Sequence, residues 1–359
     1  MRSSALTGNK GEWSEIYALL RLLADGHLHL GDAELLPIEG LILPILYVLR
    51  DDDTDGAVRS YQVLEKEIEL SLPDFSSEPI RISRERLRKE ADQLLLAISS
   101  ARETTFCIPS VMPLLSELYV EKIKAPSYSK ADIKLTIRDT RMGGTPTLGF
   151  SIKSKLGSPS TLLNASLATN IAYQLSPLLQ TEVIEKCNKE KGFREKLSIL
   201  TRLGEHPIYA EVPDRCFRNN LKLIDSLLPE ILAESLLIYY SGQASKLSDI
   251  MQILRVQNPL NFDLEQHDFY TYKMKKLLVE IALGMTPKRP WDGQYTASGG
   301  YIIVKREGDL VGYHFYDRNL LEEYLLMNTS FDTPSTTRHR FGSIDESGRL
   351  LLNVQIRFR

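Results

Sequence analysis

Apolar residues near the start of the chain recur at the three- and four-residue spacing of a helix. Between residues 11 and 26 they cover nearly the whole circumference and comprise Trp13, Ile16, Tyr17, Leu19, Leu20, Leu22 and Leu23. This pattern predicts a helix that is buried on most sides and that ends at Gly26. Glu15 lies on the same helix, so we expect a carboxylate in or beside the interior.

Two segments in the middle of the chain alternate polar and apolar residues. Residues 132–138 and 147–155 each follow this period of two, which is typical of strands with one buried face. The residues between them, from Arg141 to Pro146, include two glycines and a proline, which favour a turn. The sequence therefore predicts a β-hairpin over residues 132–155.

The rest of the chain mixes both patterns. Short apolar runs broken by Gly, Asp and Pro predict a small strand-rich part over residues 28–80. Further helices are expected over residues 83–101 with Ser83 as N-cap, 110–124, 160–179, 216–241 and 269–283, before a strand-rich end over residues 301–358. These elements predict an α/β fold of the mixed α+β kind, with a central mixed sheet flanked by helices. We divide the chain into a core helix (1–27), the strand-rich part (28–80), a core with the hairpin (81–190) and a C-terminal region (191–359).

Composition adds few constraints. The 359 residues are 43% hydrophobic and 25% charged, as in an ordinary globular protein, and the net charge is −3. The chain has no overall positive field, so any contact with nucleic acid must be local. The first residues lack a continuous apolar run, so neither secretion nor membrane insertion is expected. Three widely spaced cysteines, Cys107, Cys187 and Cys216, form no CxxC pair, which suits a reducing cytoplasm.

The predicted hairpin carries the side chains of a metal-dependent hydrolase. Asp132 begins the first strand, while Ser151, Lys153 and Lys155 share one face of the second. A carboxylate beside a lysine can hold a hard divalent cation and orient water beside a phosphate. Asp, about twenty residues, then (Asp/Glu)-x-Lys is the signature of PD-(D/E)XK nucleases, and here Ser151 replaces the second acid. The alternative is a hairpin whose polar face is simply solvated.

Glu15 is a candidate for the missing second acid. Several nucleases of this fold take that acid from a core helix, and the predicted helix supplies Glu15, with Glu12 one turn earlier as the alternative. The structural alternative for Glu15 is a helix carboxylate paired with a nearby Arg or Lys. His27 and His29 stand two residues apart without a third ligand nearby, and we do not expect them to hold a metal.

Five ordered strings resemble the HpaII family of type II restriction endonucleases. They span residues 8–17, 148–166, 313–319, 334–342 and 352–358. The resemblance implies a restriction-endonuclease-like core and Mg²⁺-dependent cleavage of both strands of double-stranded DNA at a short palindrome, with 5′-CCGG-3′ as the target. It also implies a companion DNA methyltransferase. In this mechanism Asp132 and Glu15 hold Mg²⁺, Lys153 positions or deprotonates the attacking water, and Ser151 reaches the metal through a water.

Contacts to DNA are expected in two groups of residues. Lys155 and the hydroxyl- and amide-bearing residues after it, at the start of the expected helix over 160–179, face DNA phosphate or cap that helix: Ser158, Ser160, Thr161 and Asn164. Arginine with a neighbouring acid commonly reads G·C pairs. Candidates are Arg84 with Arg86, Asp214 with Arg215, and Arg338-His339-Arg340. The last group is favoured because it lies in a family-like string, although it could instead clamp phosphate or pair with Asp345 and Glu346.

Two alternatives from other functional classes remain. A protein with a decayed metal site, marked by Ser151, would bind DNA without cutting it. A structural or adaptor protein would show neither Mg²⁺ dependence nor salt-sensitive DNA binding. A palindromic target favours a two-fold homodimer, whereas a monomer could cut the two strands in turn.

Overall fold

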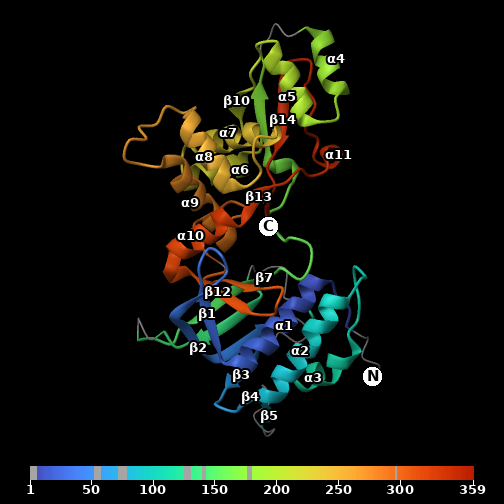
Figure 1. The fold of residues 1–359 in the computed structure, drawn as a ribbon, viewed down its shortest axis with the longest axis vertical. Coiled ribbons are helices and arrows are strands. Elements are labelled where there is room, and N and C mark those ends of the chain that lie inside the picture. The colour runs from blue at the N-terminus through green and yellow to red at the C-terminus, as the bar shows by residue number, and fades with distance from the viewer. Residues whose placement is uncertain are drawn as a thin grey trace. The chain divides into compact units, whose positions relative to one another are not determined.

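The chain folds into two compact units, each completed by a distant segment of sequence. The computed structural model describes residues 6–51, 58–71, 79–124, 131–139, 143–175, 180–295 and 297–359. Unit 1 comprises Met1–Ser160 and Tyr295–Leu321, and unit 2 comprises Thr161–Gln294 and Glu322–Arg359 (Figure 1). This division is coarser than the four segments expected from the sequence.

Unit 1 is built on a mixed sheet of nine described strands. In chain order these are β1 (His27–Gly31), β2 (Pro37–Asp51), β3 (Val58–Val63), β4 (Glu67–Ser71), β5 (Ile80–Ser83), β6 (Ile133–Ile137), β7 (Thr147–Ser154), β11 (Gly300–Val304) and β12 (Leu310–His314). Their order is β1-β12-β11-β7-β6-β2-β3-β4-β5, and β1 also pairs with β2. The pairs β7–β11 and β1–β12 are parallel and the others antiparallel. The expected central mixed sheet is confirmed, and the strands of residues 28–80 belong to it.

Three helices accompany this sheet, and their ends follow local capping chemistry. Helix α1 (Lys10–Asp25) begins at a capping box between Asn9 and Glu12 and ends at Gly26, whose φ of 64° is left-handed. Helix α2 (Arg84–Ser100) begins at Ser83, whose side chain accepts from the Arg86 N–H. Both predicted helices are confirmed. The helix expected over 110–124 is shorter, since α3 (Met112–Glu117) ends before Tyr119, which has a φ of 54°.

The core of unit 1 lies between α1, α2 and one face of the sheet. Trp13 and Ile16 of α1 are fully buried and belong to the same cluster as Leu135, Phe150 and Ile302 of the central strands. Because side chains alternate along a strand, burying Phe150 and Ile152 on this face directs Ser151 and Lys153 of β7 to the other face. The apolar packing therefore fixes which way the polar residues of the hairpin point.

Unit 2 contains most of the helices and two small antiparallel sheets. Its helices are α4 (Thr181–Lys189), α5 (Phe193–Arg202), α6 (Arg215–Ile224), α7 (Leu228–Tyr240), α8 (Leu247–Gln257), α9 (Phe269–Leu283), α10 (Arg318–Met327, which begins in unit 1) and α11 (Thr336–His339). One sheet has the order β10-β9-β14, from β9 (Asn170–Gln174), β10 (Ile208–Glu211) and β14 (Arg349–Asn353). The other has the order β13-β15-β8, from β8 (Thr161–Leu163), β13 (Thr329–Phe331) and β15 (Ile356–Phe358).

The prediction of a helix over residues 160–179 is wrong. In its place the described residues form β8, a single 3₁₀ turn (Leu167–Thr169) and β9, while residues 176–179 lie outside the described part. β9 pairs with β14, so that Ala172 opposes Leu351, and its first four residues are buried. A short apolar run of this kind fits a buried strand as well as a helix, and a distant partner decides between them.

The helices expected in unit 2 are confirmed in part. The expected helix over 216–241 is interrupted between α6 and α7, where the Leu228 N–H donates to the Asp225 carbonyl, whereas the helix over 269–283 is confirmed. The cysteines Cys107, Cys187 and Cys216 are free thiols. No helix among the described residues has both the length and the apolar character needed to cross a bilayer.

Candidate active site

The antiparallel pairing of β6 and β7 brings Asp132 beside the second strand. Ile133 opposes Phe150, and the Asp132 N–H donates to the Phe150 carbonyl at 2.8 Å. The predicted hairpin over 132–155 is confirmed, although residues 140–142, which include Arg141, lie outside the described part. Asp132 therefore stands directly before β6, at the point where the two strands begin to separate.

Three polar side chains of the hairpin form one hydrogen-bonded chain. The Lys153 Nζ donates to the Ser151 Oγ at 2.8 Å, and the Ser151 Oγ donates to the Asp132 Oδ2 at 3.1 Å. The same carboxylate oxygen accepts from the Ile152 N–H at 2.6 Å. Ser151 is only 3% exposed, so its hydroxyl links the lysine and the carboxylate away from bulk water. The three residues that the sequence singled out on this hairpin are thus adjacent.

Tyr301 of β11 extends the site on the side opposite β6. β7 and β11 are parallel neighbours in which Ser151 opposes Tyr301 and Lys153 opposes Ile303. The Lys153 ammonium lies 5.4 Å from the centre of the buried Tyr301 ring, a distance suited to a cation–π interaction. This contact and the Ser151 hydroxyl together limit where the lysine can move. Tyr301 was not foreseen, because the pairing of β7 with a strand 150 positions later leaves no local signal in the sequence.

Glu15 lies on α1 close to where this helix contacts β7. Its neighbour Ser14 is fully buried, and the Ser14 Oγ is hydrogen-bonded to the Ser154 Oγ at 2.7 Å. Ser154 in turn directly follows Lys153 on β7. Glu15 itself is partly buried. The serine pair therefore fixes the segment of α1 that carries Glu15 against the strand that carries Lys153.

Glu12, the alternative acid, has a structural task. Its Oε2 accepts from the Asn9 N–H at 2.9 Å, which completes the capping box at the start of α1. Its Oε1 lies 4.0 Å from the Lys124 ammonium. These contacts engage the Glu12 carboxylate at the helix terminus, and both glutamates stay candidates for the second acid.

The oxygen donors at the hairpin suit a hard cation. Among the described residues, no group of three or more His, Cys, Asp or Glu side chains gathers at one point. Mg²⁺ usually keeps several water ligands and takes only one or two protein carboxylates together with substrate phosphate. Asp132, with the Ser151 hydroxyl beside it, fits that kind of sparse oxygen site better than a dense site of the zinc type.

No α-helix begins in the described segment between β7 and β9. Ser158 is exposed and Ser160 partly exposed in the connection to β8, Thr161 is the first residue of β8, and Asn164 is exposed just beyond it. The predicted phosphate site at the start of a helix, and the capping role given to Ser160, therefore lose their structural basis. The four residues lie on either side of the point where the chain leaves unit 1.

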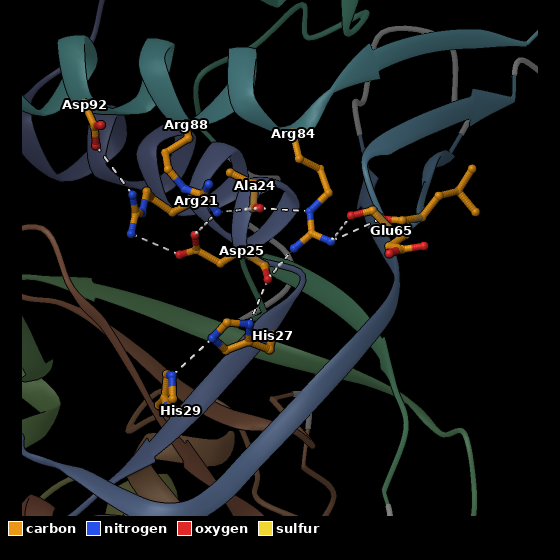
Figure 2. A network of polar contacts seen from close by, with 10 residues as sticks. Arg21, Ala24, Asp25, His27, His29, Glu65, Arg84, Arg88 and Asp92 are labelled. Atoms are coloured by element: carbon orange, nitrogen blue, oxygen red, sulfur yellow. Dashed lines mark hydrogen bonds and ion pairs between the residues drawn. The ribbon is translucent and has the colours of Figure 1, made fainter.

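Arg84 holds unit 1 together through four backbone carbonyls. Its guanidinium donates to Ala24 at 2.9 Å and Asp25 at 2.6 Å, at the end of α1, and to Leu64 at 3.2 Å and Glu65 at 2.9 Å, before β4. Figure 2 shows the side chain reaching from α2 between these two segments. Arginine at the negative end of a helix dipole is stabilising. The guanidinium is thereby committed to the interior of the unit rather than to a DNA base.

Arg86, His27 and His29 also have partners within unit 1. Arg86 binds Glu117 through two parallel hydrogen bonds of 2.7 Å, and this contact lowers the pKa of the Glu117 carboxyl. His27 and His29 lie in the polar network of Figure 2, where their Nε2 atoms are 3.1 Å apart and the His27 Nδ1 is 2.7 Å from the Asp25 carbonyl.

The remaining base-reading candidates belong to unit 2. Asp214 caps α6 by accepting from the Phe217 N–H at 2.8 Å, and Arg215 after it is exposed. Arg338 and Arg340 are both exposed, at the end of and just after α11. His339 lies between them, and burial, followed by the nearby charges of Arg338 and Lys288, lowers its pKa. The described structure therefore leaves Arg338 and Arg340 oriented to solvent, unlike Arg84.

Comparison with known proteins identifies the chain. A family model described as HpaII restriction endonuclease matches residues 9–358. The chain is 43% identical over 357 residues to the type II restriction enzyme HpaII of Haemophilus parainfluenzae, covering 98% of each chain. No solved structure matches it. The protein is therefore a restriction endonuclease, a type II site-specific deoxyribonuclease that acts on DNA. It belongs to the HpaII family, as its sequence strings indicated.

Proposed function

We propose that this restriction endonuclease hydrolyses both strands of double-stranded DNA at 5′-CCGG-3′ with Mg²⁺ as cofactor. The observation that carries the catalytic part is the hydrogen-bonded chain from Lys153 through Ser151 to Asp132 on adjacent strands. The target sequence rests on the resemblance to the HpaII family. In a cell, a companion methyltransferase would protect the same sites in the cytoplasm.

The proposed reaction needs a nucleophile, an electrophile and a place for developing charge. Bound Mg²⁺ would polarise the phosphate and stabilise negative charge on its oxygens. Asp132 and Glu15 would supply the carboxylates that hold it, Asp132 directly before β6 and Glu15 within α1, elements that the hairpin and the Ser14–Ser154 contact hold in place. Each residue therefore acts from a rigid element of the unit, as accurate placement requires.

Lys153 has the task of orienting the attacking water. Its ammonium is restrained by the Ser151 hydroxyl and by the Tyr301 ring, so it presents its remaining N–H groups in a narrow range of directions. Ser151 stands where the PD-(D/E)XK signature has an acid, and a hydroxyl there couples lysine to carboxylate without adding a second negative charge. Glu15 then supplies the charge that the serine lacks.

The first experiment is cleavage of a plasmid that carries several CCGG sites. The purified protein is incubated with Mg²⁺ or with EDTA, and the ends of the products are sequenced. Asp132→Ala and Lys153→Ala are compared with Asp92→Ala and Lys89→Ala, which remove the same charges from exposed positions on α2.

Each outcome is informative. We expect discrete Mg²⁺-dependent fragments that end at CCGG, lost in the two hairpin variants and retained in the two controls. Fragments that end elsewhere would keep the nuclease and overturn the target. Tight binding without cleavage would instead favour a decayed nuclease that binds its site, which the serine at position 151 makes the second candidate.

A further inference from the structure

A pair of cations stands at the end of the strand that carries Lys153. The last residues of β7 and β11 are paired, with Ser154 opposite Val304, and the Lys155 N–H donates to the Val304 carbonyl at 2.9 Å. The chain then turns from β11 to β12 through Lys305 and Arg306. Lys155 and the first residues of this turn therefore lie side by side on neighbouring parallel strands.

Among the described residues, Lys305 is the cation of this group that forms ion pairs. The Lys305 ammonium binds Glu307 at 2.6 Å and lies 3.8 Å from Asp309. Within the described ranges, neither Lys155 nor Arg306 makes an ion pair or a side-chain hydrogen bond, and Arg306 is exposed. Burial lowers the pKa of Lys155, the nearby charge of Arg306 lowers it further, and the Glu307 carboxylate acts in the opposite direction. Two like charges held close together favour the binding of an anion between them.

The turn that carries Arg306 is rigidly placed. The Gly308 N–H donates to the Lys305 carbonyl at 3.1 Å, and the Lys305 N–H donates to the Asp309 carbonyl at 2.9 Å. The Tyr17 hydroxyl of α1 donates to the Gly308 carbonyl at 2.6 Å and fixes the turn to the core helix. Arg306 thus projects from a preorganised turn, so little conformational freedom of the backbone is lost when it binds a ligand.

The distance along β7 from Lys153 to Lys155 places the pair of cations beside the proposed catalytic site. Lys155 is two residues beyond Lys153, so it lies about 6–7 Å further along the same face of the strand. Successive phosphates of one DNA strand are separated by a rise of about 3.4 Å and by the turn of the backbone around the axis. A strand that places Lys153 at the cleaved phosphate therefore carries Lys155 toward the phosphate beside it.

We propose that Lys155 and Arg306 form the binding site for the DNA phosphate next to the cleaved one on the same strand. The inference rests on the proposed function, because it takes Lys153 to stand at the cleaved phosphate. Lysine and the planar fork of arginine both donate to phosphate oxygens, and among the described residues the carboxylate closest to this turn, Glu307, forms its ion pair with Lys305 instead. Their contact holds the strand in register while the hairpin acts on it.

The first test measures binding without catalysis. A CCGG duplex is titrated in EDTA over a range of salt concentrations with the parent protein, Lys155→Ala, Arg306→Ala and the double variant. Lys89→Ala is the charge-matched control, because Lys89 is exposed on α2 and paired with Glu85. We expect the double variant to lose about tenfold or more in affinity. The slope of log K against log salt should fall by about 0.9 for each contact removed.

The second test locates the phosphate. Once the cleaved bond has been mapped from the product ends, a neutral methylphosphonate replaces one phosphate at a time in the duplex. The parent should lose affinity when the phosphate beside the cleaved one is neutralised, whereas the double variant should lose nothing further at that position. Equal additional losses in the parent and the double variant at every position would overturn the proposal. So would a double variant that behaves like Lys89→Ala.

Cleavage by the parent protein distinguishes a failure of this inference from a failure of the proposed function. If the parent fails to cut CCGG DNA in Mg²⁺, the proposed function fails. If the parent cuts and the Lys155 and Arg306 variants match the control, the phosphate site alone is wrong.

Discussion

Lys153 donates a hydrogen bond to the Ser151 hydroxyl at 2.8 Å. This contact joins the lysine, which is the cation of the proposed catalytic group, to a buried serine of the same group. Ser151→Ala keeps Asp132 and Lys153 but removes the link between them. Because partners that orient a catalytic group are worth about 10- to 100-fold, we expect a loss of that size in the single-turnover cleavage rate. Ser151→Thr, which retains the hydroxyl, should recover most of it. Equal rates for the alanine and threonine variants would show that the hydroxyl has no role.

The second acid can be assigned by comparing two glutamates one turn apart. Glu15→Gln should abolish cleavage at low Mg²⁺, leave thermal stability nearly unchanged and recover partly at high Mg²⁺, since a metal ligand is weakened. Glu12→Ala should keep cleavage but lower the free energy of unfolding by about 1 kcal/mol, because it breaks the capping box at Asn9. The reverse pattern in a metal titration and a melting experiment would assign the acid to Glu12.

Arg84 should matter strongly for stability, although the residue is only partly buried. Arg84→Ala removes hydrogen bonds to four carbonyls, of which Ala24 still accepts from Arg88 and Asp25 lies 2.7 Å from the His27 Nδ1, whereas Leu64 and Glu65 lose the Arg84 donor. We expect the free energy of unfolding to fall by at least about 2 kcal/mol in urea denaturation. Arg81→Ala is the control, because Arg81 is exposed and its ion pairs with Glu67 and Glu69 are worth at most about 1 kcal/mol. Similar midpoints for the two variants would contradict this role.

Because of Glu234 on α7, we expect the stability of the protein to fall as the pH rises above the ordinary range of a glutamate. Burial raises the pKa of its carboxyl above the ordinary value of 4.5, so the folded chain binds this proton more strongly than the unfolded chain. Stability therefore falls as the pH rises from the ordinary value through the raised one. Glu234→Gln cannot ionise, so it should be more stable than the parent at neutral pH and equal to it below the ordinary value. Melting curves across this range test the difference, and a constant offset would contradict it.

Arg338 and Arg340 can be tested as readers of bases. If Arg338 forks onto guanine, Arg338→Ala should weaken binding to the cognate duplex by about 1–3 kcal/mol and reduce discrimination at one base pair. If it contacts phosphate, binding should weaken uniformly across sequences and the salt slope should fall by about one. Affinities for CCGG and for duplexes with one altered pair distinguish these results. The same measurement on Arg340→Ala shows whether the second arginine reads a different position.

Local chemistry made part of this structure predictable. Gly26 and Ser83 mark the ends of α1 and α2 because a left-handed residue and a capping hydroxyl satisfy backbone groups within one turn of themselves. The alternation around Asp132 and Lys153 gave the hairpin for a similar reason, since both strands and their turn are contiguous. The proposed catalytic group, apart from Glu15, lies entirely within that contiguous segment.

Non-local pairing accounts for what the sequence did not show. Residues 161–174 form strands because β14 and β15, far along the chain, supply their partners. Tyr301 and Arg306 join the site through the pairing of β11 with β7. Arg84 lies in a basic helix whose sequence resembles a DNA-binding face. Its guanidinium is nevertheless hydrogen-bonded to carbonyls of α1 and of the residues before β4. Each of these outcomes depends on a contact that no local pattern encodes.

The position of β11 in the chain has a consequence during synthesis. In the sheet, β7 pairs with β6 on one edge and with β11 on the other. When β7 has been synthesised, β6 already exists, but the other edge stays unpaired until Gly300–Val304 has been made. The 145 residues between Ser154 and Gly300 take about 7–30 s to translate. Throughout that interval the nascent chain holds Asp132, Ser151 and Lys153 on an unfinished sheet without Tyr301. The proposed catalytic group is therefore complete on the sheet only after Gly300–Val304 has been synthesised.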